Sequence, residues 1–151
     1  MLATLILDFD GTIVESLPLK TAAFRKVFSF APPAHLDEII AFHLENGGMS
    51  RYDKFRYIYA HILHEPLTPK QEERLASKYV SLIFESMLTV PCVEGAEDLL
   101  EGCSHALPLY IVSATPEGEM QEIARRRGLT KYFVRVYGSP KTKAECIREI
   151  L

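Results

Sequence analysis

The chain has 151 residues, 48% of them apolar and 25% charged, and a formal net charge of −3 at pH 7. The length suits one domain, or a modest core with a small insert, and the composition is ordinary for a soluble globular protein. The slight negative charge gives no indication of binding to nucleic acid or to an anionic membrane.

Three cysteines, far apart and without C-x-x-C spacing, indicate reduced thiols in a cytoplasmic protein. No basic region precedes the N-terminal apolar run, and Asp8 follows too early for a signal peptide. No apolar stretch reaches the length that spans a membrane. We therefore expect neither a membrane nor a nucleic acid as a partner.

The first element is the apolar run Leu2–Leu7, which ends at Asp8. Only Ala3 and Thr4 dilute it, so it predicts a strand buried on both faces. Asp10 follows two residues later and, in an extended chain, would point the same way as Asp8. Because two carboxylates at a strand tip repel each other, we expect a cation beside them, and a divalent metal is favoured. The alternative is a strand followed by a plain Asp-Gly turn.

The pattern then changes to four successive helices without an intervening strand. Prolines suited to a first turn, capping hydroxyls and terminal glycines mark their limits. Apolar residues at helical spacing, Phe30 and Leu44 among them, predict their inner faces. The predicted helices are Pro18–Phe30, His35–Asn46, Arg51–His64 and Thr68–Leu88. Together they indicate a helical insert with its own small core.

From Val93 onwards, helices alternate with short buried strands. This alternation implies a parallel sheet with right-handed crossovers. Ligands of such sheets bind beyond the carboxyl ends of the strands, where Asp8 and Ser113 are expected. The predicted elements are helix Val93–Gly102, strand Leu107–Val112, helix Pro116–Gly128, strand Phe133–Tyr137 and helix Lys143–Leu151.

Three sequence motifs resemble the haloacid dehalogenase (HAD) superfamily. Asp8-Phe9-Asp10-Gly11-Thr12-Ile13 is similar to its first signature, D-x-D-G-T followed by an apolar residue. Ser113, at the end of a predicted strand, resembles the second signature. Lys143, opening a helix, resembles the third, with Lys141 as its rival. The resemblance extends over essentially the whole chain, because the helical insert falls where many members of the phosphoglycolate-phosphatase-like and beta-phosphoglucomutase-like branch carry a cap.

The resemblance implies an α/β fold, with a HAD-like, Rossmann-type parallel sheet as its core and an inserted all-helical cap. The core would comprise residues 1–14 and 90–151, and the cap residues 15–89. The family's fourth signature, an acidic pair after a further strand, has no match before Leu151. We therefore expect a core that is incomplete at its C-terminus and a metal site short of one ligand.

An incomplete sheet would leave the first strand as an exposed apolar edge, which favours self-association. We interpret the sequence as a fragment of a longer protein. Two alternatives remain: a neighbouring chain that supplies the edge, and a degenerate member of the family.

The resemblance further implies a magnesium-dependent phosphatase that acts on a small phosphorylated metabolite. Asp8 would be the nucleophile that forms an aspartyl-phosphate, and Asp10 the general acid/base. Asp8 and the backbone carbonyl of Asp10 would hold Mg²⁺. Ser113 and Lys143 would complete the catalytic set by binding and neutralising phosphoryl oxygens. Within the family, the second acid favours a phosphatase over a dehalogenase.

Four further residues are candidates for substrate binding: Thr12, Arg51, Ala114 and Lys141. Thr12 is expected to orient Asp10, and a plain turn hydroxyl is the alternative. Arg51 follows Gly47-Gly48-Met49-Ser50, which resembles a cap turn whose basic residue touches substrate. A solvated arginine is its alternative, and Lys54 is a weaker candidate.

Two other segments are given no chemistry. Arg125-Arg126-Arg127 is predicted to be a solvated helix end. Glu15 and Ser16 follow the first signature, where Glu15 is expected to serve the connection to the cap.

Two other functions stay open: a phosphomutase with the same nucleophile, and a non-catalytic fragment or binding module. We expect the protein to be a hydrolase of phosphoric monoesters and the 151-residue chain alone to have little activity.

Overall fold

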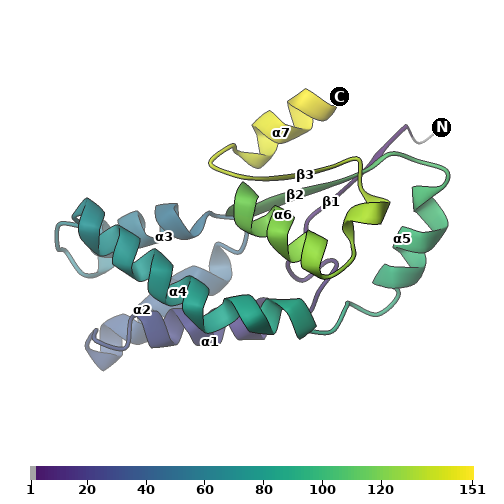
Figure 1. Ribbon diagram of the computed structural model, residues 1–151. Helices are drawn as coiled ribbons and strands as arrows, with labels where there is room; N and C mark the ends of the chain where they lie inside the picture. The colour runs from purple at the N-terminus through teal and green to yellow at the C-terminus, as the bar shows by residue number, and fades with distance from the viewer. Residues whose placement is uncertain (1–2) are drawn as a thin grey trace. The chain divides into compact units, whose positions relative to one another are not determined.

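The computed structural model describes residues 3–151 and divides the chain into two compact units (Figure 1). The first unit joins Met1–Leu17 to Met87–Leu151, and the second is Pro18–Ser86. In the described part of the chain, no helix is both long and apolar enough to cross a membrane. All three cysteines are free thiols.

The first unit is built on a three-stranded parallel sheet with the order β1-β2-β3. Leu5 pairs with Leu109 across β1 and β2, and Ile111 pairs with Val136 across β2 and β3. The predicted α/β class and parallel pairing are therefore confirmed. The strands are β1 (Leu5–Leu7), β2 (Leu109–Pro116) and β3 (Arg135–Ser139).

Helices cover both faces of this sheet, and Figure 1 shows α6 and α7 on opposite sides of it. Val112, Tyr137 and Cys146 form a buried cluster that fixes α7 against β2 and β3. The alternation of strand side chains places Ile111 and Val136 on the opposite face. The helical elements are α5 (Ala96–Ser104), α6 (Glu117–Arg126), the 3₁₀ turn η2 (Thr130–Tyr132) and α7 (Lys143–Ile150).

Strand β1 is shorter and more exposed than the sequence predicts. Leu5, Ile6 and Leu7 are only half-buried, so the prediction of burial on both faces is wrong. The reason is that β1 lies at the edge of the described sheet and pairs with β2 alone. The predicted apolar edge is confirmed, and Leu2 of the predicted strand lies outside the described residues.

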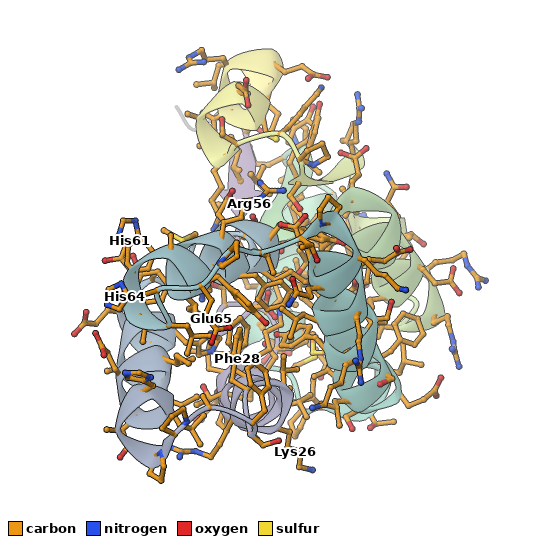
Figure 2. All side chains as sticks on the ribbon, turned by 90° about the vertical axis from the view of Figure 1, so that its left-hand side faces the viewer. Lys26, Phe28, Arg56, His61, His64 and Glu65 are labelled. Atoms are coloured by element: carbon orange, nitrogen blue, oxygen red, sulfur yellow. The ribbon has the colours of Figure 1, made fainter. Side chains whose placement is uncertain are left out.

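The second unit consists of helices packed around aromatic side chains. Phe24, Phe28 and Phe55 are fully buried, and their ring centroids lie 5.8–6.0 Å apart. Figure 2 shows Phe28 inside this unit, whereas Lys26 projects outwards. The elements are α1 (Leu17–Val27), α2 (Pro33–Glu45), α3 (Arg51–Tyr57), the π-helical turn η1 (Ile58–Ile62) and α4 (Pro69–Thr89).

The sequence predicts the limits of the helices better than it predicts which of their residues are buried. The Ser50 hydroxyl accepts a hydrogen bond from the Asp53 N–H at 3.2 Å, which confirms the predicted cap of α3. Leu44 and Phe30 are 61% and 57% exposed, so their prediction as inner residues is wrong. Phe30 lies beyond the end of α1 at Val27, where helical spacing no longer sets its direction.

Candidate active site

The acidic segment after β1 is a tight turn wrapped around one backbone carbonyl. The carbonyl of Phe9 accepts hydrogen bonds from the N–H groups of Ile13 at 2.9 Å and Val14 at 3.2 Å. The Phe9 side chain is fully buried between the two half-buried acids and anchors the turn. Gly11 has φ +70°, and a Cβ there would lie 2.8 Å from Leu17 Cδ1, so this turn requires glycine.

Lys143 reaches the carboxylate at the tip of β1. Its Nζ lies 2.5 Å from Asp8 Oδ2, although 135 residues separate the two in sequence. Both side chains remain 35% exposed, so a ligand can reach them. The Thr142 hydroxyl accepts the N–H of Glu145 at 3.2 Å, and the Glu145 carboxylate accepts the N–H of Thr142 at 2.7 Å. This capping box begins α7 at Lys143 and thereby sets where its ammonium points.

Lys141, the rival lysine, has a different partner. It pairs with Glu149 on α7, and its ammonium lies 5.9 Å from the centroid of the Tyr137 ring. The hydrogen bond that Lys141 donates to the Glu149 carboxylate raises the pKa of Lys141 above its usual value. The structure therefore brings Lys143, and not Lys141, to Asp8.

Asp10 is held by the hydroxyl of Ser16, a residue for which the sequence predicts no role. The Ser16 hydroxyl donates to Asp10 Oδ1 at 2.6 Å, and the Ser16 side chain is fully buried. Thr12, expected in this position, is exposed and contributes its backbone N–H to the carbonyl of Phe9 at 3.4 Å. The turn swings Thr12 outwards and brings Ser16 back. Spacing within the motif could not show this reversal.

Ser113 lies inside β2 and not at its end, because the strand continues to Pro116. The predicted strand end at Val112 is therefore wrong. The regular pairing with β3 is, however, interrupted between Val112 and Pro116. Ser113 is 2% exposed, and its hydroxyl oxygen accepts the N–H of Thr115 at 3.1 Å. Ala114, beside it, is partly exposed.

A close approach of β3 supports the same end of β2. A Cβ on Gly138 would lie 2.4 Å from the carbonyl oxygen of Thr115 and 2.6 Å from Glu117 Cα. The Gly138 N–H also donates to Glu117 Oε2 at 3.3 Å. Only glycine permits this contact, at a position where the sequence predicts an ordinary turn.

Arg51 and Lys54 lie in the helical unit, and both are buried there. Arg51 is 6% exposed and its guanidinium lies 4.7 Å from the centroid of the Tyr79 ring, so the alternative of a solvated arginine is wrong. Lys54 is 3% exposed and donates to the carbonyl oxygen of His43 at 3.1 Å. Burial, together with the charges of Lys54 and Lys20, lowers the pKa of His43 to about 3.

The residues at the tip of β1 suit a hard divalent cation in part. Asp8 Oδ1 accepts the N–H of Phe9 at 2.7 Å, Oδ2 contacts Lys143, and Asp10 Oδ1 accepts from Ser16. Carboxylate oxygens can accept further bonds. Mg²⁺ commonly uses one or two carboxylates and keeps several waters. Within residues 3–151, no group of three or more acidic, histidine or cysteine side chains could hold a metal ion. The fit is therefore partial: the Asp8 carboxylate and the backbone carbonyl of Asp10 would hold such a cation, and the Asp10 carboxylate would remain available for proton transfer.

A parallel α/β sheet with an acid–lysine pair at the carboxyl end of one strand is typical of α/β proteins that bind their ligands at the strand ends. A family model described as haloacid dehalogenase-like hydrolase matches residues 5–149, and the chain belongs to that family. A search of curated proteins finds no match.

Solved structures share this fold. A haloacid dehalogenase-like family hydrolase from Streptococcus pneumoniae superposes with a TM-score of 0.67 at 24% identity, over 99% of this chain and 69% of that one. A predicted phosphoglycolate phosphatase from Haemophilus somnus gives 0.68 at 17%, over 93% and 65%. A predicted phosphatase from Clostridium acetobutylicum gives 0.71 at 18%, over 99% and 69%. The chain thus spans about two thirds of the length of these proteins.

Proposed function

We propose that the protein is a magnesium-dependent phosphatase that hydrolyses a small phosphate ester through an aspartyl-phosphate on Asp8. The observation that carries this proposal is the contact between Lys143 and Asp8, which joins two distant segments at a half-exposed position. A carboxylate that attacks a phosphate ester meets another anion, so a neighbouring cation is needed to offset the repulsion. Lys143 supplies that charge.

Two displacements account for the hydrolysis. In the first, an oxygen of Asp8 attacks the phosphorus, the bond to the leaving oxygen breaks, and Asp10 gives that oxygen a proton. In the second, Asp10 takes a proton from water, the water oxygen attacks the phosphorus, and the bond to Asp8 breaks to release phosphate. Ser16 holds Asp10 for both proton transfers, and the Ser113 hydroxyl binds a phosphoryl oxygen. Mg²⁺, held by Asp8 and Asp10, would offset the charge of the phosphoryl group when bound.

The substrate contacts are also part of the proposal. Thr12 and Ala114 would lie near the phosphoryl group, and Arg51 would bind a second anionic group of the substrate. The burial of Arg51 against Tyr79 supports a preset side chain, because an ordered guanidinium loses less entropy on binding an anion. Lys141, engaged with Glu149, is the least favoured member of the set.

Replacement of the nucleophile tests the proposal. Asp8→Asn should abolish magnesium-dependent hydrolysis of p-nitrophenyl phosphate by the whole encoded protein. Asp98→Asn, on the exposed first turn of α5, is the matched control and should retain the activity. Hydrolysis that persists in Asp8→Asn would refute the assignment.

A phosphomutase with the same nucleophile is the alternative, and the fate of the phosphoryl group separates the two. A phosphatase releases inorganic phosphate from simple esters without an activator. A mutase should protect its aspartyl-phosphate from water and require a bisphosphate. Isomerisation of a sugar phosphate that depends on an added sugar bisphosphate, without release of inorganic phosphate, would favour the mutase.

A further inference from the structure

One arginine of the run Arg125-Arg126-Arg127 does not behave as a solvated helix end. Arg127 is only partly exposed, and its Nη1 donates to the carbonyl oxygen of Met87 at 2.8 Å. Its Nη2 lies 3.5 Å from Cys92 Sγ. Arg125, in contrast, pairs with Glu122 on its own helix at 2.7 Å and is exposed. The prediction of solvation is therefore wrong for Arg127.

Arg127 is well suited to hold the end of α4. Met87 lies within the last four residues of that helix, whose carbonyls have no partner inside the helix. A guanidinium at a helix C-terminus satisfies such a carbonyl and interacts favourably with the helix dipole. The Met87 side chain is 1% exposed, so this end of α4 is buried within the first unit.

The segment held by Arg127 is paired with the segment that follows the acidic turn. The Glu15 N–H donates to the carbonyl of Pro91 at 2.9 Å, and the Val93 N–H donates to the carbonyl of Ile13 at 2.9 Å. These two bonds flank the antiparallel bridge between Val14 and Cys92. Residues 13–16 lead out of the first unit (the outgoing segment), and residues 87–93 lead back into it (the return segment). The two segments are thus hydrogen-bonded to each other inside the first unit.

The outgoing segment ends in Ser16, whose hydroxyl holds Asp10. Hydrogen bonds therefore join Arg127 to the return segment, the return segment to the outgoing segment, and Ser16 of the outgoing segment to the carboxylate of Asp10. We infer that Arg127 is a positioning residue for Asp10, acting through the two paired segments. The inference rests on the proposed function only in giving Asp10 a role in the chemical step.

Amide exchange tests the first half of the inference without any activity. Arg127→Ala removes a charge-assisted hydrogen bond, so exchange of the Glu15 and Val93 amides should rise about 10- to 100-fold in NMR-detected exchange of the 151-residue chain. Arg125→Ala is the matched control and should leave both amides unchanged. Unchanged exchange in Arg127→Ala would overturn the inference.

A conservative variant covers the case in which Arg127→Ala does not fold. Arg127→Lys keeps the charge but offers a single point donor, so it should give exchange intermediate between wild type and loss of the contact. Its control is Arg125→Lys. Equal exchange in these two variants and wild type would also overturn the inference.

Coupling to Asp10 is tested by a double-mutant cycle. In the whole encoded protein, Arg127→Ala and Ser16→Ala should each lower kcat on the order of 10-fold with KM nearly unchanged. If both act through Asp10, the double variant should lose much less than the product of the two. Fully multiplicative losses would overturn the positioning role. Absence of phosphatase activity in the wild type would refute the proposed function but leave the exchange result standing.

Discussion

The ammonium of Lys54 lies 3.2 Å from Nδ1 of His43 inside the helical unit. Lysine has only donors, so Nδ1 accepts and the ring carries its proton on Nε2. The ring of Phe24 stacks on the same imidazole at 4.0 Å between centroids. His43 is therefore a buried, neutral histidine, and this burial should reduce the stability of the folded chain at low pH.

Acid should destabilise the protein through His43. Its folded pKa of about 3 lies below the usual histidine value of 6.5, so between these two pH values the unfolded chain binds a proton that the folded chain does not. Stability should therefore fall as the pH drops from 6.5 towards 3, by about 2 kcal/mol after allowance for solvent screening. Urea unfolding at pH 7, 5.5 and 4 measures this loss.

His43→Gln should flatten that pH dependence, since the amide oxygen can accept from Lys54 but does not titrate. His105→Gln, at an exposed position, should leave it as in the wild type. A parallel decline in His43→Gln and wild type would contradict this account.

Loss of the Lys143 charge should reduce catalysis far more than stability. Lys143→Ala is expected to lower kcat by about 100-fold or more, because Asp8 would then attack a phosphate without a neighbouring cation. The unfolding free energy should change by about 1 kcal/mol at most, since both side chains are partly solvated. Steady-state kinetics and urea unfolding of the same sample separate the two effects, with Lys141→Ala as the matched control. Comparable losses of activity in both variants would contradict the assignment of Lys143.

The start of α7 should be sensitive to its cap. Thr142→Ala removes the hydroxyl that accepts the N–H of Glu145 and should destabilise the protein by about 1 kcal/mol. Thr142→Ser retains the acceptor and should have little effect. Thermal or urea unfolding measures the difference, and equal stability of the two variants would show that the cap contributes nothing.

Gly138 should not tolerate a side chain. Gly138→Ala would place a Cβ 2.4 Å from the Thr115 carbonyl oxygen, and the backbone would have to shift. We expect a loss of about 1–3 kcal/mol, in the range of overpacked cores. Gly118→Ala, where a Cβ meets nothing within 4 Å, is the control. Urea unfolding of both variants checks this, and a wild-type stability for Gly138→Ala would mean that β3 can move away from β2.

The sequence predicted the fold class and the acidic turn after β1, because these depend on local pattern. Apolar runs, caps and the D-x-D-G-T motif are recognised within a few residues, and Ser50 caps α3 and Lys143 begins α7 as expected. The contact partners were harder, because they depend on how the turn after β1 folds back. Ser16 and not Thr12 meets Asp10, and the difference is one reversal of the chain.

The same limit explains the arginine run. Successive side chains at the end of a helix point in directions about 100° apart, and Arg127, which caps α6, points differently from Arg125 and Arg126. Periodicity could not tell that Met87 and Cys92 lie beside Arg127, since α4 and the return segment approach it from 35 to 40 residues away. Burial of β1 failed for a related reason, because an edge position is a property of the whole sheet.

Helix α7 makes charged contacts with residues at two different strands of the sheet. Its first residue, Lys143, reaches the end of β1, while Glu149 in its last turn accepts from Arg135 of β3 at 3.1 Å. A helix of eight residues is not stable in water by itself and depends on its packing and its cap. The charge beside the acid at the tip of β1 is therefore only as persistent as the local folding of α7. Fraying of this helix would remove the Lys143 ammonium from Asp8 while the rest of the sheet stays intact.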